Sequence, residues 1–154
     1  MPDKFKAIVI DNQSEKFSRE IKELDVSFLD QGEVLVKVDY SDLNYKDALI
    51  LNDGGKLVRD FPRIPGIDFS GKVVESSASE FKKDEEVILT GCRVGEMYHG
   101  GYSQLAKVKK EFLVKKPKNL STKESMIMGT AGFTALLCAF AVNAREELLL
   151  KILF

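Results

Sequence analysis

Short apolar runs separated by turn residues dominate the first two thirds of the chain. Residues 5–10 form one such run, and residues 34–38 alternate apolar and polar positions so that Val34, Val36 and Val38 share one face. Runs of the same kind recur at 70–75, 86–90, 102–108 and 112–114. Glycine and proline lie between the runs and mark turns. The spacing predicts a small, barrel-like β domain.

Two segments have helical rather than strand spacing. Residues 44–51 predict a helix behind Ser41 or Asp42 as the N-cap, with a stop at Asn52-Asp53-Gly54. A second helix is predicted from about 130 to 147. Residues 121–124 carry the serine and glutamate of a capping box, which predicts a short helix before the long one. The fold class expected is therefore mainly β with α.

Residues 125–144 carry no charge, which is a length that could cross a membrane. Several small or polar residues interrupt the stretch, and its flanks carry charges of both signs. These features favour a buried helix of a soluble protein.

The composition narrows the function classes. Of 154 residues, 44% are hydrophobic and 31% are charged, which is ordinary for a soluble domain. Twenty-three basic and 24 acidic residues give a net charge of −1, and no basic stripe or cluster indicates a nucleic acid or membrane partner. The polar start of the chain does not resemble a signal peptide. Cys92 and Cys138 are far apart and are expected to be free thiols, so the expected location is cytoplasmic.

Sites for metals and nucleotides lack their sequence signatures. His99 and two separated cysteines do not make a Cys/His zinc cluster, so no metal site is predicted. His99 lies in a glycine-rich turn, where a packing role is favoured. Neither a P-loop nor a G-x-G-x-x-G turn occurs, so the sequence contains no complete nucleotide site.

Three polar features could carry chemistry. Residues 44–47 read N-Y-K-D at a helix start, although composition alone favours a plain helical turn with Tyr45 half buried. Asp68 is isolated among apolar residues, and a carboxylate buried there needs a partner, unless it caps its own loop as an Asx turn. Thr134 lies on an otherwise apolar helix and could simply bond the carbonyl four residues earlier.

Four motifs, in order, resemble one family. They are N-Y-K-D-A at 44–48, P-G-I-D-F-S-G at 65–71, L-T-G with V-G-E at 89–96, and G-T-A-G-F-T-A at 129–135. Over residues 4–143 they are similar to the zinc-free quinone-oxidoreductase-like, acryloyl-CoA reductase branch of the medium-chain dehydrogenase/reductase superfamily. The resemblance implies a GroES-like β-barrel domain, then a Rossmann domain, with the active site in the cleft between them.

The resemblance also implies roles for single residues. Asn44 and Ile67 stand where zinc-dependent relatives carry a cysteine and a histidine ligand. Asn44 and Tyr45 would line the pocket for the nicotinamide and the acyl substrate, with Tyr45 as the candidate proton donor. Thr134 would approach the nicotinamide, and Arg59 could face the cleft on the substrate side.

The other residues of that region would be structural. Asp47 and Asp68 would form the polar wall near the site. The family usually has a glycine near position 93, where this chain has Arg93, and a side chain there would strain a turn that needs positive φ.

The family would continue past residue 143 through a loop and strand into a glycine-rich phosphate turn. Residues 148–154 could be the first Rossmann strand or unrelated sequence, so the chain is expected to be truncated, with the Rossmann domain missing. We expect a GroES-like domain over 1–125 and a connecting helix with the start of the dinucleotide-binding domain over 126–154.

These features predict part of a zinc-independent, NADPH-dependent reductase that transfers a hydride to an activated C=C bond or a quinone. NADPH belongs to the complete family enzyme, and this chain alone is expected to bind none and to be inactive. The partner would be a small acyl-CoA or quinone substrate, and the apolar C-terminal helix predicts self-association. A non-enzymatic binding module and a non-functional remnant are the alternatives.

Overall fold

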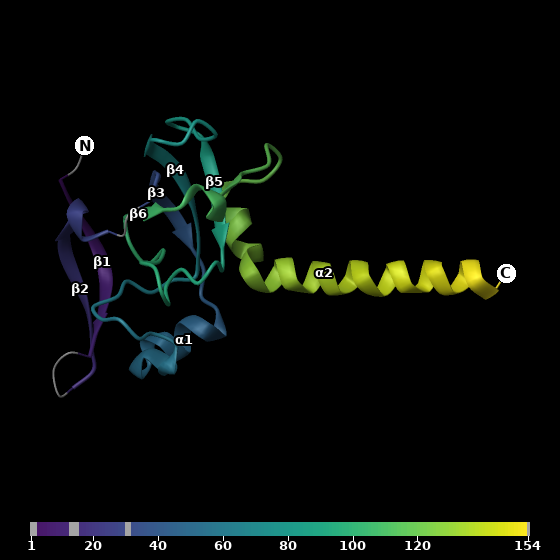
Figure 1. Ribbon diagram of the computed structural model, residues 1–154, viewed down its shortest axis with the longest axis horizontal. Coiled ribbons are helices and arrows are strands. Elements are labelled where there is room, and N and C mark those ends of the chain that lie inside the picture. The colour runs from purple at the N-terminus through teal and green to yellow at the C-terminus, as the bar shows by residue number, and fades with distance from the viewer. Residues whose placement is uncertain (1–2, 13–15, 30–31, 154) are drawn as a thin grey trace.

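Two antiparallel sheets make up the body of the molecule (Figure 1). The computed structural model describes residues 3–12, 16–29 and 32–153, with side chains described as far as residue 143. Strands β1 (Lys4–Asp11) and β2 (Ser18–Asp25) form one sheet. The other has the order β6-β3-β4-β5-β7, with the bounds β3 Val34–Ser41, β4 Asp68–Ser76, β5 Glu86–Thr90, β6 Leu105–Val108 and β7 Val114–Lys115.

The segment before β6 joins the two sheets. The Gln104 N–H donates to the carbonyl of Lys6 in β1 at 2.9 Å, while its own carbonyl accepts from Val38 in β3 at 3.0 Å. The isolated bridge between Ala7 and Ser103 continues this connection. The predicted barrel-like domain of short strands is therefore confirmed.

Strand β3 lies between two parts of the core. Val34 and Val36 are buried with Phe69 inside the five-stranded sheet, and Val38 packs against them, as the alternation predicted. Leu35 points the other way, into a second core with Phe5 of β1. Both faces of β3 are therefore covered at its start.

The first helix, α1 (Tyr45–Leu51), begins later than predicted. Its N-cap is Asn44, not Ser41 or Asp42, because β3 continues as far as Ser41. Its C-cap is Asn52, which confirms the predicted stop. Three 3-10 turns complete the body: η1 (Val26–Phe28), η2 (Asp53–Lys56) and η3 (Lys110–Phe112).

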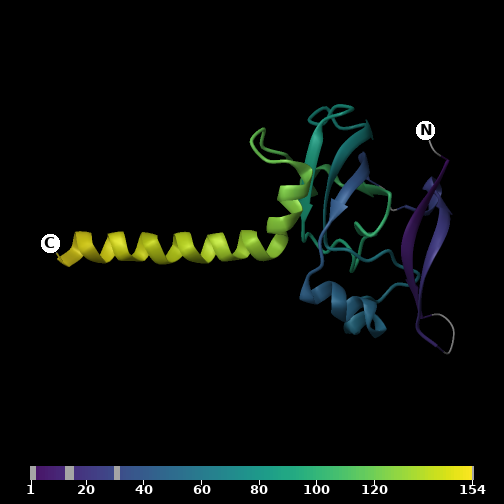
Figure 2. The same cartoon turned by 180° about the vertical axis from the view of Figure 1, so that it is seen from behind.

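The C-terminal helix, α2 (Thr122–Leu153), has a sharp bend and then projects far from the body (Figures 1 and 2). The bend is at Gly129, whose φ of 47° and ψ of −158° are not helical. The capping box is present, since Glu124 Oε2 accepts from the Ser121 N–H at 2.8 Å and Ser121 Oγ accepts from the Glu124 N–H at 3.1 Å. The predicted short helix before the long one is confirmed.

Two predictions about α2 were wrong. The backbone stays helical to Leu153, past the expected end at 147, so the tail is not a strand. The stretch 125–144 is not a buried helix either, because almost all side chains from 131 to 143 are exposed. No part of the described chain packs against that half of α2. Residues Thr122–Asn143 are long and apolar enough to cross a membrane, a test that core helices of soluble proteins also pass.

Smaller predictions agree with the structure. His99 is buried, its Nδ1 accepts from the Ile64 N–H at 3.2 Å, and its ring stacks on Phe28, so it has a packing role. Cys92 and Cys138 are free and exposed. Arg93 has a φ of 60°, a strained value for a residue with a side chain.

Candidate functional site

Asp68, the first residue of β4, is fully buried and holds several distant segments together. Its Oδ1 accepts from the Gly91 N–H at 2.9 Å and from the Thr130 hydroxyl at 2.7 Å. Its Oδ2 accepts from the Thr130 N–H at 2.6 Å and from the Asn44 carboxamide at 3.1 Å. These four donors satisfy the need for partners that burial of a carboxylate imposes.

Both polar side-chain atoms of Asn44 form hydrogen bonds within the protein. Its Nδ2 donates to Asp42 Oδ1 at 2.7 Å as well as to Asp68. Its backbone N–H donates to Asp47 Oδ2 at 2.9 Å, and its carboxamide oxygen closes the capping box on the Asp47 N–H. The Asn44 side chain therefore fixes the start of α1 against β4.

Asp47 ties α1 to the P-G-I-D segment. It is fully buried, and its Oδ1 accepts from the Ile67 N–H at 2.9 Å. Ile67 itself is buried with Ile50 of α1. Asp42, Asn44, Asp47, Asp68 and Thr130 together form what we call the polar cluster.

Burial and mutual repulsion disturb the carboxyl groups of the polar cluster. Burial first, then the charge of Asp68, raises the pKa of Asp42 to about 7. Burial also raises the pKa of Asp47, although hydrogen bonds from Asn44 and Ile67 oppose this. The pKa of the Tyr102 phenol is raised by burial and by Asp47 and Asp42, and its hydroxyl donates to the Asp42 carbonyl at 2.9 Å. Around neutral pH, Asp42 can therefore carry a proton beside Asp68.

The bend in α2 is fitted against the polar cluster. Gly129 has positive φ, and a Cβ built on it would lie 1.8 Å from Asp42 Oδ2 and 3.0 Å from Asp68 Oδ2. Two independent reasons therefore require glycine at position 129: the positive φ of its backbone, and the lack of room for a Cβ beside the Asp42 and Asp68 carboxylates. The next residue, Thr130, is the one that Asp68 holds.

The other residues expected in the site are more exposed. Tyr45 is 81% exposed at the first turn of α1, so a half-buried position was wrong. Its neighbour Lys46 pairs with the buried Glu96 at 2.8 Å. Thr134 is exposed on α2, and its hydroxyl donates to the Thr130 carbonyl at 2.8 Å, as the alternative reading predicted.

Arg59 does not join the polar cluster. It is exposed after η2, and none of the described contacts connects it with the cluster. The structure thus brings Asn44, Asp47 and Asp68 together, with Tyr45 beside them and Thr134 one helical turn beyond Thr130.

Sequence reasoning missed three residues of this region. Asp42 was considered only as a helix cap, Thr130 was passed over within G-T-A-G-F-T, and Tyr102 was taken only as part of a strand. The only local signal for Asp42 was its place two residues before Asn44, in the segment that leads into the N-Y-K-D motif. Nothing local indicated that Thr130 would supply two of the four donors to Asp68.

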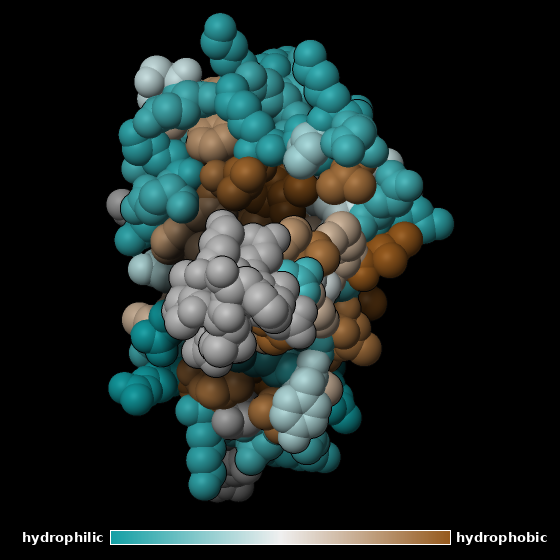
Figure 3. Space-filling model, turned by 90° about the vertical axis from the view of Figure 1, so that its right-hand side faces the viewer, coloured by the Kyte–Doolittle hydropathy of each residue, from teal (hydrophilic) through white to brown (hydrophobic). Residues whose placement is uncertain are grey.

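An apolar surface surrounds the polar cluster. Near it, exposed apolar side chains come from the loop after β3, from α1, from the loop after β5 and from the first turns of α2: Leu43, Tyr45, Met97, Ile127 and Met128. Figure 3, seen along α2, shows apolar side chains on this face of the molecule, beside and above the end of the helix. Farther along α2, Phe133, Leu136, Leu137, Phe140 and Val142 are exposed as well. Exposed apolar patches of this extent mark interfaces.

The described residues offer little for a metal or a whole dinucleotide. No group of three potential metal ligands occurs among them. The Asn44 carboxamide is already engaged, which leaves Tyr45 and the acceptor side of the Thr134 hydroxyl as free polar groups. The described part of the chain has no G-x-G-x-x-G turn or P-loop at a helix N-terminus that could hold a pyrophosphate.

The alcohol dehydrogenase GroES-like domain matches residues 30–118, which is more than half of the chain. The chain belongs to this family. It is 48% identical over 141 residues to the acrylyl-CoA reductase AcuI of Ruegeria pomeroyi, covering 90% of this chain and 43% of that protein. It is 42% identical to the putative quinone oxidoreductase YhfP of Bacillus subtilis, covering 93% of this chain and 42% of that protein. Membership of the medium-chain dehydrogenase/reductase superfamily is thereby confirmed.

Solved structures agree with the GroES-like assignment. E. coli YhdH with bound NADPH superposes with a TM-score of 0.86 at 46% identity, covering 90% of this chain and 43% of that one. An alcohol dehydrogenase from Pyrobaculum aerophilum, at 21% identity and a TM-score of 0.67, shows the same fold. The chain thus spans less than half the length of the relatives it matches, and it covers the GroES-like part of their fold.

Proposed function

We propose that this chain forms the substrate-side domain of a zinc-independent reductase that uses NADPH to reduce an activated C=C bond, such as that of an enoyl-CoA, or a quinone. The observation that carries the proposal is the polar cluster that holds the exposed Tyr45 at the start of α1. The segment that builds it lies within the 48% match to an acrylyl-CoA reductase.

The residues of this chain would orient the acceptor and supply a proton. NADPH supplies a hydride, which would add to the β-carbon of the C=C bond, so that the α-carbon must gain one proton. The Tyr45 phenol would give that proton and recover it from water. Asn44 and Asp68 would act through position, because their polar atoms are engaged within the cluster.

The cofactor wall and the domain limits follow from this proposal. Thr134 and Asn44 would face the nicotinamide side, and Arg59 would lie on the substrate side. Residues 1–125 would be the GroES-like domain and 126–154 the connecting helix. The chain alone would bind no NADPH and would be inactive, with acyl-CoA or quinone as the substrate class of the complete enzyme.

The exposed half of α2 supports two further parts of the proposal. Its apolar side chains are uncovered by the described chain, so we propose that the isolated protein self-associates there. The same surface favours a second candidate function, that of a non-enzymatic binding module. The free cysteines support a cytoplasmic location.

A chimeric enzyme tests the reductase proposal. Residues 1–143 of this chain replace the matching part of the probable acrylyl-CoA reductase AcuI of E. coli, which is 46% identical. We expect NADPH oxidation with acrylyl-CoA, and comparison with a soluble quinone assigns the substrate class. A folded chimera that oxidises NADPH with neither acceptor would contradict the proposal and favour the binding module.

The role of Tyr45 is tested in the same chimera. The change Tyr45→Phe removes only the hydroxyl, and we expect kcat to fall by about 10²–10⁴. Tyr40→Phe, at another exposed tyrosine, is the matched control and should leave kcat unchanged. Equal kcat for both variants would show that Tyr45 is not the proton donor.

A further inference from the structure

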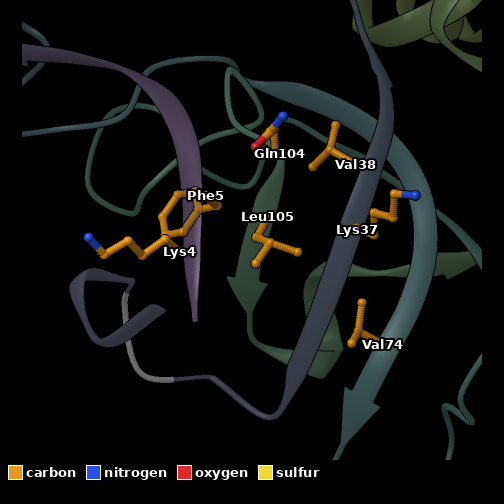
Figure 4. A pocket seen from close by; sticks show the side chains of 7 residues that line it. All are labelled: Lys4, Phe5, Lys37, Val38, Val74, Gln104 and Leu105. Carbon is orange, nitrogen blue, oxygen red and sulfur yellow. The ribbon is translucent and has the colours of Figure 1, made fainter. Parts of the chain in front are cut away.

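A groove of about 450 Å³ lies between β1 and the five-stranded sheet, and none of the polar cluster lines it (Figure 4). It exists because the two sheets separate beyond Gln104. Gln104 is bonded to both Lys6 and Val38, but from Leu105 onward β6 pairs with β3, while β1 pairs with β2. The wall residues are Lys4, Phe5, Lys37, Val38, Val74, Gln104 and Leu105.

The floor of the groove is apolar. Phe5 and Leu105 lie on its two sides in Figure 4 and belong to one buried core cluster, against which Val74 packs. The volume is within the range of small-molecule pockets, about 300–1,000 Å³. An apolar chain or ring of a small ligand therefore fits the floor.

The charges at the rim are all positive. Lys4 and Lys37 line the groove, and no acidic residue does. Lys37 also lies directly opposite Lys72 across β3 and β4, an arrangement of like charges that disfavours pairing. Lys4 is 3.5 Å from Glu23, and Lys72 is 3.9 Å from Glu86.

Of these three lysines, Lys37 is the one for which the described residues provide no ion-pair partner. None of the ion pairs recorded between described residues includes it. In Figure 4 the Lys37 ammonium points away from Phe5 and Leu105, and a change of rotamer would lay its methylenes along the apolar surface and bring the ammonium to the edge of the groove. An anion at that edge would neutralise Lys37 and relieve its repulsion with Lys72.

We propose that this groove binds a small amphiphilic carboxylate, with its apolar body against Phe5, Leu105 and Val74 and its carboxylate at Lys37. The charge selects an anion and the floor selects an aliphatic or aryl body. The site is independent of the reductase proposal, because it shares no residue with the polar cluster.

Amide-resolved NMR with decanoate, below its micelle concentration, tests the proposal. We expect saturable shifts at Phe5, Val74 and Leu105. Decylamine has the same chain and the opposite charge, and it should bind about tenfold more weakly or worse. Lys37→Gln should weaken decanoate by a similar factor, whereas Lys118→Gln, at an exposed lysine outside the groove, should not.

A second variant separates the groove from the apolar half of α2. Val74→Phe fills the groove and should abolish the shifts at Phe5 and Leu105. Shifts confined to residues 133–142, equal binding of decylamine, or decanoate affinity unchanged by Lys37→Gln would each overturn the proposal. Lys37 is exposed, so its variant reports on binding even if Val74→Phe fails to fold.

Discussion

Within the polar cluster, burial and the neighbouring carboxylates disfavour the ionised form of Asp42. It is partly buried, Asp68 and Asp47 lie close to it, and its pKa rises from 3.8 to about 7. Between these values the folded protein binds a proton at Asp42 that the unfolded chain has released. Since folded molecules then hold more protons, the free energy of unfolding falls as the pH rises through this interval. Above pH 7 Asp42 is ionised in both the folded and the unfolded protein, so its ionisation changes the free energy of unfolding no further.

Asp42→Asn tests this linkage. Asparagine keeps an acceptor for Asn44 but does not titrate, so the variant should lose much less stability than the native chain between pH 4 and pH 7, a window set by the pKa of Asp42. Urea unfolding at several pH values measures this, with Asp60→Asn, at an exposed residue, as the control. The same pH dependence in the native chain and the Asp42→Asn variant would contradict the assignment.

For single residues, the sequence predicted which side chains need hydrogen-bond partners, but not which distant residues supply them. That Asp68 needed donors followed from its apolar neighbours, and the simple i−4 bond of Thr134 followed from its helix. The donors to Asp68 come from positions 44, 91 and 130, which no local pattern connects. The exposure of Tyr45 likewise depends on what the rest of the fold leaves uncovered.

Gly129 sets the geometry of α2 as an element. Its positive φ ends one helix and begins the next, while Asp68 holds Thr130 on the far side of the bend. The direction in which the long helix leaves the body therefore depends on contacts at the polar cluster.

Gly129→Ala should destabilise the protein more than Gly91→Ala does. Both glycines have positive φ, so alanine is strained at either position, by about 1–3 kcal/mol in the backbone. An added Cβ at Gly91 meets nothing within 4 Å, whereas at Gly129 it meets Asp42, so we expect about 1–3 kcal/mol more there. Denaturant unfolding measures both. Adding Asp42→Ala should recover part of the difference, and equal costs at the two glycines would contradict the account.

Helices and strands with a clear capping or apolar pattern were predictable from the sequence, whereas β2, which has no such pattern, was not. The capping box of α2 and the apolar strands follow from local chemistry. Strand β2 was missed because its residues, S-R-E-I-K-E-L-D, are mostly polar, and Ile21 is 75% exposed. It forms a strand because its whole length pairs with β1, a tertiary cause. Residues 148–153 are helical, so of the two alternatives for the tail the strand is not formed, and the described chain offers no neighbouring strand with which it could pair.

For the whole molecule, the apolar half of α2 is the surface through which we propose that the isolated chain self-associates. Phe133, Leu136, Leu137 and Phe140 fall at helical spacing on one side and are exposed. Burial of each large apolar side chain is worth about 1.5–3 kcal/mol, which favours association through this surface.

Self-association should depend on that surface. We expect light scattering to give a mass that rises with concentration for the native chain. The double change Leu136→Glu and Phe140→Glu should leave a monomer, because each buries a charge in the contact. Lys118→Glu serves as the control for added negative charge. A native chain that stays monomeric would contradict the prediction.

Calorimetric titration with NADPH tests the central claim most directly, namely that this chain supplies the substrate wall and not the dinucleotide site. We predict no binding heat with the chain alone and low-micromolar binding with the folded chimera, whose added part contains the remainder of the relative. Low-micromolar NADPH binding by the chain alone would contradict the account.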